Sequence, residues 1–84
     1  MLEVIKRDGS ILPFDLSKIK SAIERAFRAE HKEFTPDIIE LLALRATAVF
    51  NTKVKDEKVS VEDIQDAVEI ALIQTNYIDV AKSY

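Results

Sequence analysis

The hydrophobic and polar positions divide the chain into two short apolar runs followed by longer stretches with helical spacing. The two runs, LEVIK at residues 2–6 and SILPF at residues 10–14, are separated by three residues that end in Asp8-Gly9. An Asp-Gly pair between such runs predicts a β-hairpin, because glycine accepts the positive φ that a tight turn requires. Pro13 cannot donate a ladder hydrogen bond, so the second strand is predicted to lie at a sheet edge.

The middle of the chain predicts two helices, each preceded by a residue that can cap it. Asp15 is predicted to cap a helix over residues 16–29, and Thr35-Pro36 opens a second helix that runs to about Phe50. The second helix is apolar over a wide arc, which predicts that it packs between other elements. The arc consists of two neighbouring faces, one with Ile39, Leu42, Ala46 and Val49 and the other with Ile38, Leu41, Leu44 and Ala48.

The last third of the chain predicts a short strand and two more helices. The strand is KVSV at residues 58–61, where Ser60 and Asp63 resemble a capping box for the third helix. Asn76 is predicted to cap a fourth helix, whose apolar stripe reaches Tyr84 and is expected to pack in the core or between subunits. The alternative is that Tyr77 and Tyr84 face a base. The order β-β-α-α-β-α-α predicts an α+β fold, in which a helical bundle carries a small sheet. Because the last helical pattern meets the chain end without a stop signal, we expect a fragment of a longer polypeptide.

Composition and charge narrow the function classes. The chain has no cysteine, which excludes disulfides, thiolate zinc sites and a cysteine nucleophile. Its one histidine, His31, is expected to be an exposed loop residue, so we expect no metal site and no catalytic triad. The net charge of −3 argues against nucleic-acid binding. No apolar stretch approaches the roughly 18 residues of a membrane span, so we expect no membrane partner and a cytoplasmic location.

One cationic cluster is a candidate binding site. Lys6 and Arg7 are adjacent at the predicted hairpin turn, and Lys18 follows in the first helix. A hairpin folded onto the start of that helix would bring the three cations around one polyphosphate, with Val4 packing against a base. The same residues also suit a solvated turn, and no Gly-rich phosphate loop or grouped carboxylates for magnesium accompany them. The residues alone therefore leave both interpretations open.

Several sequence blocks resemble the ATP-cone family. VIKRDG at residues 4–9 matches the family's opening V-x-K-R-D-G motif, and PFD at 13–15 and KIKSAI at 18–23 match its sequel. VSVEDIQDAVE at residues 59–69 is similar to the second recurring block, and AKSY at 81–84 looks like the start of the closing A-x-x-Y motif. The blocks occur in the family's order, and the resemblance covers essentially the whole chain.

The resemblance implies a four-helix bundle capped by a three-stranded mixed sheet, with residues 1–84 forming one ATP-cone domain at the N-terminus of a longer chain. It also implies ATP or dATP as the allosteric ligand, with Mg. The family's nucleotide contacts, carried over residue by residue, fall on Val4, Lys6, Arg7, Asp15, Lys18, Val61 and Gln65. Some members have threonine and histidine where this chain has Val61 and Gln65, so these two positions depart from the pattern.

The function that the resemblance implies is allosteric regulation of a ribonucleotide reductase, without catalysis by this domain. Its partners would be adenine nucleotides, the remainder of the reductase chain and the reductase oligomer. The PFD and IQDAVE blocks favour the anaerobic type of reductase. One alternative is the ATP-cone of a transcriptional repressor of reductase genes, but that family places a four-cysteine zinc ribbon before the cone. Another is a degenerate cone that serves only as an interaction domain.

Overall fold

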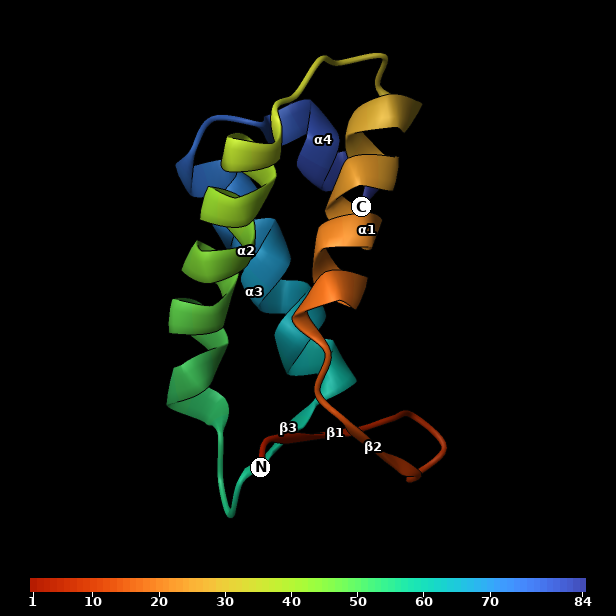
Figure 1. The fold of residues 1–84 in the computed structure, drawn as a ribbon, viewed down its shortest axis with the longest axis vertical. Helices are drawn as coiled ribbons and strands as arrows, with labels where there is room; N and C mark the ends of the chain where they lie inside the picture. The colour runs from red at the N-terminus through yellow and green to blue at the C-terminus, as the bar shows by residue number, and fades with distance from the viewer.

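The elements form where the apolar pattern predicts them, with only small shifts of their ends. A computed structural model describes all residues, Met1–Tyr84, as helices standing above a small sheet (Figure 1). In chain order the elements are β1 (Glu3–Ile5), β2 (Ile11–Pro13), α1 (Leu16–Ala29), α2 (Pro36–Phe50), the 3₁₀ turn η1 (Asn51–Lys53), β3 (Lys58–Ser60), α3 (Val61–Gln74) and α4 (Ile78–Ser83). This arrangement confirms the predicted α+β class, a four-helix bundle with a three-stranded mixed sheet.

The sheet has the strand order β2-β1-β3 and lies at one end of the bundle (Figure 1). β1 runs antiparallel to β2, with Val4 opposite Leu12, and parallel to β3, with Val4 opposite Val59. Pro13 therefore lies in an edge strand, as predicted. Since parallel neighbours need a long crossover, the chain passes through α1 and α2 before β3 can pair with β1.

The hairpin turn is fixed by hydrogen bonds within five residues. The Lys6 N–H donates to the Ser10 carbonyl at 2.8 Å, and the Gly9 N–H donates to the Lys6 carbonyl at 2.9 Å. Gly9 has φ 87, the left-handed value that closes a three-residue hairpin loop. The Asp8 carboxylate accepts from the Ser10 N–H at 2.9 Å and from the Ser10 hydroxyl at 2.6 Å. These bonds hold the two adjacent cations, Lys6 and Arg7, in a defined loop.

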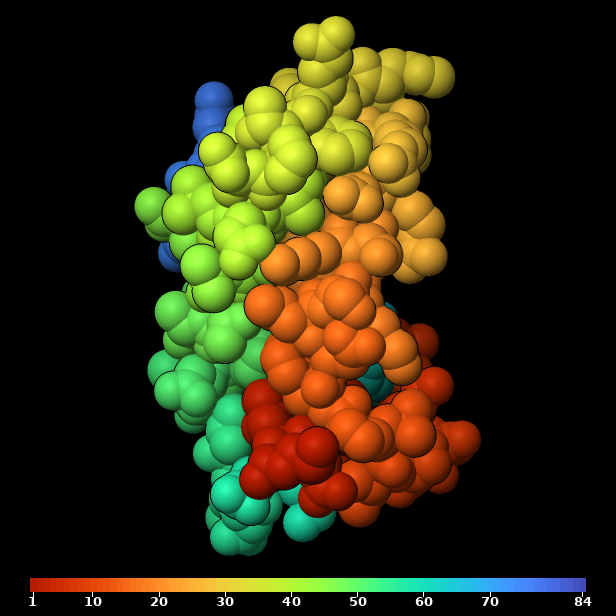
Figure 2. All heavy atoms as spheres, in the orientation of Figure 1, coloured from red at the N-terminus to blue at the C-terminus, as the bar shows by residue number.

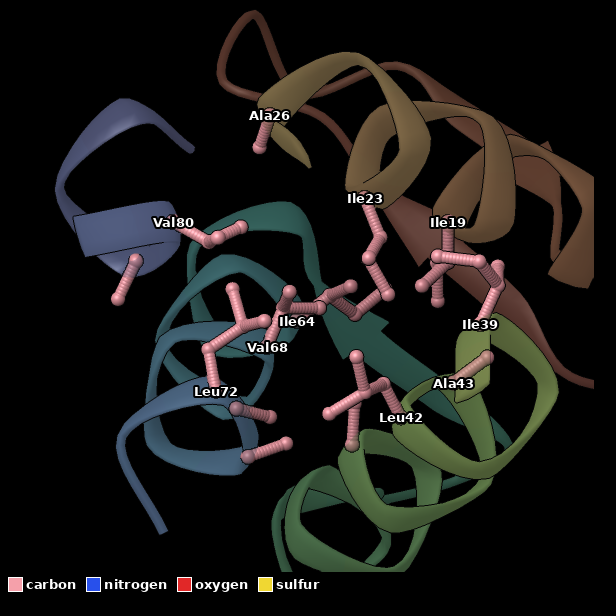
Figure 3. Close-up of a cluster of buried hydrophobic side chains, with 14 of the residues drawn as sticks. Ile19, Ile23, Ala26, Ile39, Leu42, Ala43, Ile64, Val68, Leu72 and Val80 are labelled. Carbon is pink, nitrogen blue, oxygen red and sulfur yellow. The ribbon is translucent and has the colours of Figure 1, made fainter. Parts of the chain in front are cut away.

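The core is formed by 17 buried side chains, all of them apolar. Figure 3 shows Ile23 of α1, Leu42 of α2 and Val68 of α3 pointing toward one another, with Val80 of α4 at the edge of the same cluster. Each helix therefore contributes one face to a single core. No helix is long and apolar enough to cross a bilayer.

Three helices begin at the predicted caps. The side chains of Asp15, Thr35 and Ser60 accept backbone N–H bonds of 3.0, 3.2 and 3.1 Å at the starts of α1, α2 and α3. The predicted capping box is only half formed. Ser60 accepts from the Asp63 N–H, but the shorter Asp63 side chain makes no return bond.

The prediction that Asn76 caps the fourth helix is wrong. Asn76 has φ 68 and ends α3: its N–H donates to the Ile73 carbonyl at 3.0 Å, and the next N–H, of Tyr77, donates to the Leu72 carbonyl at 2.8 Å. This pair of bonds is the Schellman motif, which asparagine suits because it tolerates the left-handed conformation. α4 begins at Ile78 without a side-chain cap.

The prediction that α2 packs between other elements is confirmed for one face and is wrong for the outer face, which carries Leu41 and Leu44. α2 packs against α3 and α1, but Leu41 and Leu44 remain 50% and 52% exposed. Ile70 and Ile73 of α3 are exposed as well. One side of the wide apolar arc is buried in the core, and the other side is left at the surface.

Candidate functional site

An open cleft of about 210 Å³ lies between the hairpin, the start of α1 and the start of α3. In Figure 2, teal atoms from the α3 region are visible in a gap between α1, in orange, and the hairpin, in red-orange. Thirteen residues line the cleft, and eight of them are hydrophobic. A cleft that is mostly apolar with a few charged groups is the usual form of a small-molecule site.

Helical spacing places several lining residues on the same face of each helix. Asp15, Lys18, Ile19 and Ala22 follow the i, i+3, i+4, i+7 pattern, so they share one face at the N-terminal end of α1. On α3, the first turn presents Val61, Ile64 and Gln65 in the same way. The hairpin closes the third side with Val4, Lys6 and Leu12.

The cations of the site are free to meet an anion. Lys6 and Lys18 line the cleft, and Arg7 lies on the hairpin turn beside it. None of the three forms an ion pair, since the structure's two ion pairs join the Met1 amino group to Glu57 and Lys20 to Glu40. No group of three or more His, Asp or Glu side chains converges in the structure.

Arg7 is connected to the cleft through Gln65. The Arg7 Nη2 donates to the Gln65 Oε1 at 3.0 Å, which joins the hairpin to α3 across 58 positions of sequence. Because the carbonyl oxygen of the Gln65 amide faces Arg7, its NH₂ group is left to donate to a ligand.

The carboxylate in the cleft is held ionised by its own helix. The Ser17 hydroxyl and then the Ser17 N–H donate to Asp15, and these bonds, with a smaller contribution from the Lys18 charge, hold the pKa of Asp15 below its ordinary value. Asp15 thus caps α1 and also supplies a hydrogen-bond acceptor in the wall of the cleft.

Six of the seven predicted nucleotide contacts line this cleft, and the seventh, Arg7, is bonded to one of the six. The structure therefore brings the whole predicted set together, while contact with a nucleotide stays a prediction. Seven further residues line the cleft without being among the predicted contacts: Leu12, Pro13, Phe14, Ile19, Ala22, Ile64 and Tyr84. Helical spacing from Asp15 and Val61 is the signal that points to Ile19, Ala22 and Ile64.

Tyr84 was expected to pack in the core or between subunits, with contact to a base as the alternative. It does pack against the core, but its ring also lines the cleft at the end of α4. Burial and the neighbouring charge of Glu69 raise the pKa of Tyr84, and Arg25 opposes that effect. The phenol therefore keeps its proton at neutral pH and can act as a hydrogen-bond donor.

Comparison with known proteins gives one consistent family. The profile of the ATP cone domain matches residues 2–84. The chain is 41% identical over 98% of its length to a vitamin B12-dependent ribonucleoside-diphosphate reductase of Thermoplasma acidophilum. It is 37% identical over 100% of its length to a ribonucleoside-diphosphate reductase subunit alpha of Chlamydia pneumoniae, and 35% identical over 96% to an anaerobic ribonucleoside-triphosphate reductase of Escherichia coli. The chain covers 11%, 9% and 11% of the lengths of these relatives.

Proposed function

Because the chain belongs to the ATP-cone family, a family of regulatory domains, we propose that it binds ATP or dATP in the cleft beneath the hairpin and controls a ribonucleotide reductase. The observation that carries this proposal is the convergence of Lys6, Arg7 and Lys18, which are unpaired cations, on a cleft with apolar walls. The partner that this function requires is the remainder of a reductase chain, of which residues 1–84 would form one domain.

The walls of the cleft suit the two halves of a nucleotide. The apolar side chains of Val4 and Phe14 offer contact to a purine, whereas Lys6, Arg7 and Lys18 offer charge-assisted hydrogen bonds to phosphate oxygens. Arginine binds phosphate with a planar fork and lysine as a mobile point charge, so the mixture suits a flexible polyphosphate.

Regulation in this proposal needs binding but no chemistry within the domain. An effector changes activity when its binding free energy differs between two states of the enzyme, and couplings of roughly 1–3 kcal/mol are typical. ATP and dATP differ by one ribose hydroxyl, so opposite effects of the two effectors would arise from local hydrogen bonding in the cleft. The Gln65 amide, with its NH₂ group free, is placed to contribute to that difference.

Calorimetric titration of the chain with ATP, dATP and GTP, with and without Mg, tests the proposal. We expect saturable binding that favours adenine nucleotides. The Lys6→Ala, Arg7→Ala double variant should weaken ATP binding by about 100-fold or more, because two charge-assisted contacts are lost. The matched control is Arg45→Ala, Lys53→Ala, which removes two positive charges at exposed positions outside the cleft and should stay close to wild type.

Two outcomes would contradict the proposal. A folded wild-type chain that binds no adenine nucleotide would be a degenerate cone with another role. Equal weakening in the double variant and its control would mean that ATP responds to net charge and does not occupy this cleft.

A further inference from the structure

A second hollow, of about 270 Å³, opens from the far end of the cleft. The two hollows share Ala22, Gln65 and Tyr84 as wall residues, so they lie next to each other, and together they are called the depression. Beyond the shared residues, the second hollow is lined by Arg25, Ala26 and Ser83. Its polar groups therefore come from three helices, α1, α3 and the end of α4.

The two ends of this depression differ in chemistry. Beneath the hairpin the walls are mainly aliphatic and aromatic, as a purine ring requires. The far end presents the Arg25 guanidinium, the Gln65 amide and the Tyr84 hydroxyl, which can donate to phosphoryl oxygens, whereas the Ser83 hydroxyl already donates to Glu30.

The distance along α1 fits a polyphosphate. Lys18 and Arg25 are seven residues apart, so they lie on the same face of α1, roughly 10 Å apart along its axis. A triphosphate chain together with two long cationic side chains spans that separation. Arg7, bonded to the shared residue Gln65, places a further guanidinium at the junction between the two hollows.

The charged side chains around the far hollow are one arginine, Arg25, and two carboxylates. Arg25 forms no ion pair, so its guanidinium is free. Two carboxylates lie nearby: Glu69, whose charge acts on Tyr84, and Glu30, which accepts a hydrogen bond from the Ser83 hydroxyl. Both carboxylates would repel a phosphate in this hollow. Arg25 is the cation that lines the hollow, so its attraction is what offsets that repulsion.

We propose that the hollow between α1, α3 and the end of α4 is the distal-phosphate subsite of the nucleotide site, with the Arg25 guanidinium and the Tyr84 hydroxyl as its donors. This inference rests on the proposed function, since it places the end of the same ligand. It assigns adenine to the hairpin end of the depression and the terminal phosphate to the far end. The contribution of Arg25 to affinity then grows with the number of phosphates.

Titration of the chain with AMP, ADP and ATP, for wild type and variants, tests this assignment. Arg25→Ala should weaken ATP binding by about tenfold or more and AMP binding by less than about twofold, since only the longer ligand reaches the guanidinium. Tyr84→Phe, which removes only the hydroxyl, should weaken ATP binding by a few-fold. The control Arg45→Ala removes the same charge from the exposed part of α2 and should change each affinity by less than about twofold.

The outcomes separate this inference from the proposed function. If wild type binds no ATP, both are wrong. If the Lys6→Ala, Arg7→Ala variant loses ATP binding but Arg25→Ala matches Arg45→Ala, the distal subsite is wrong and the proposed function stands. Equal weakening of AMP and ATP by Arg25→Ala would also overturn it, because Arg25 would then contact the nucleoside or first phosphate. Thermal melts establish that each variant is folded, as expected for changes at an exposed arginine.

Discussion

At the scale of single residues, short polar side chains set the positions of the charged ones. Asp8 and Asp15 each accept from the N–H and the hydroxyl of a serine two positions later, and these bonds fix the hairpin turn and the start of α1. Lys6 and Lys18, the cations of the cleft, lie within three residues of these two carboxylates. The local geometry of the candidate site thus depends on two ionised carboxyl groups.

These carboxyl groups predict a specific dependence of stability on acid. The hydrogen bonds from the two serines hold the pKa values of Asp8 and Asp15 below the ordinary value of 3.8. Groups with a lowered folded pKa stabilise the fold above their unfolded pKa, and this contribution is lost as the pH falls through the folded pKa. The Asp8→Asn, Asp15→Asn variant should therefore lose less stability than wild type between about pH 5 and pH 2.

Thermal melts across this pH range measure the effect. Asparagine keeps the ability to cap a helix, so the variant should fold at neutral pH with a lower melting temperature than wild type. Asp66→Asn, at an exposed carboxyl without a hydrogen-bond partner, serves as the control. Identical pH profiles for the double variant and wild type would mean that these hydrogen bonds do not stabilise the fold.

Single residues could be predicted from the sequence where they act on near neighbours in the chain. The caps Asp15, Thr35 and Ser60 could be predicted because each acts within three residues of its own position. The bond between Arg7 and Gln65 joins residues 58 positions apart, so no local pattern contains it. Only the family resemblance placed both residues in one site.

At the scale of elements, the bounds of α1 and α2 were predicted from the sequence, but the motifs that end α1 and α3 were not. α1 and α3 both end in a Schellman motif, with His31 and Asn76 in the left-handed conformation. The sequence predicted that His31 would be exposed, which is confirmed, but not that it ends α1. Glycine is the usual signal for this motif, so its absence from both positions hid the two motifs, although the end of α1 at residue 29 was predicted.

This helix end predicts a stabilising substitution. His31 has φ 53, and a side chain costs energy in that conformation whereas glycine does not. His31→Gly should raise the free energy of unfolding by up to about 1 kcal/mol, as measured by urea denaturation. Glu33→Gly, two residues later and without a left-handed φ, should give no gain. A destabilised His31→Gly variant would show that the imidazole contributes contacts that outweigh the backbone strain.

The outer face of α2 shows a second limit. An apolar arc predicts that a helix is buried, but Leu41 and Leu44 lie at the surface because α1 and α3 cover only one side of α2. The width of the apolar arc shows how much of the surface of α2 could be buried. The number of helices in the chain limits how much of that surface is buried. That number here is four, and α4 packs on α1 and α3 instead.

At the scale of the whole molecule, the site depends on contacts between residues that are far apart in the sequence. β1 pairs with β3 only after α1 and α2 have brought residues 58–60 back to the N-terminal strand. The same closure places the first turn of α3 opposite the hairpin, and it thereby completes the cleft. The order of elements could be predicted from spacing and caps. Their placement in space follows from the single apolar core that the four helices share (Figure 3).

The central claim is that an adenine nucleotide occupies the depression between the hairpin, α1, α3 and the end of α4. Titration of the ¹⁵N-labelled chain with ATP, followed by backbone amide NMR shifts, tests it most directly. We predict saturable shifts centred on Lys6, Lys18, Gln65 and Tyr84, with Leu44 on the outer face of α2 unchanged. A folded chain with no shifts, or with shifts centred on that outer face, would contradict the claim.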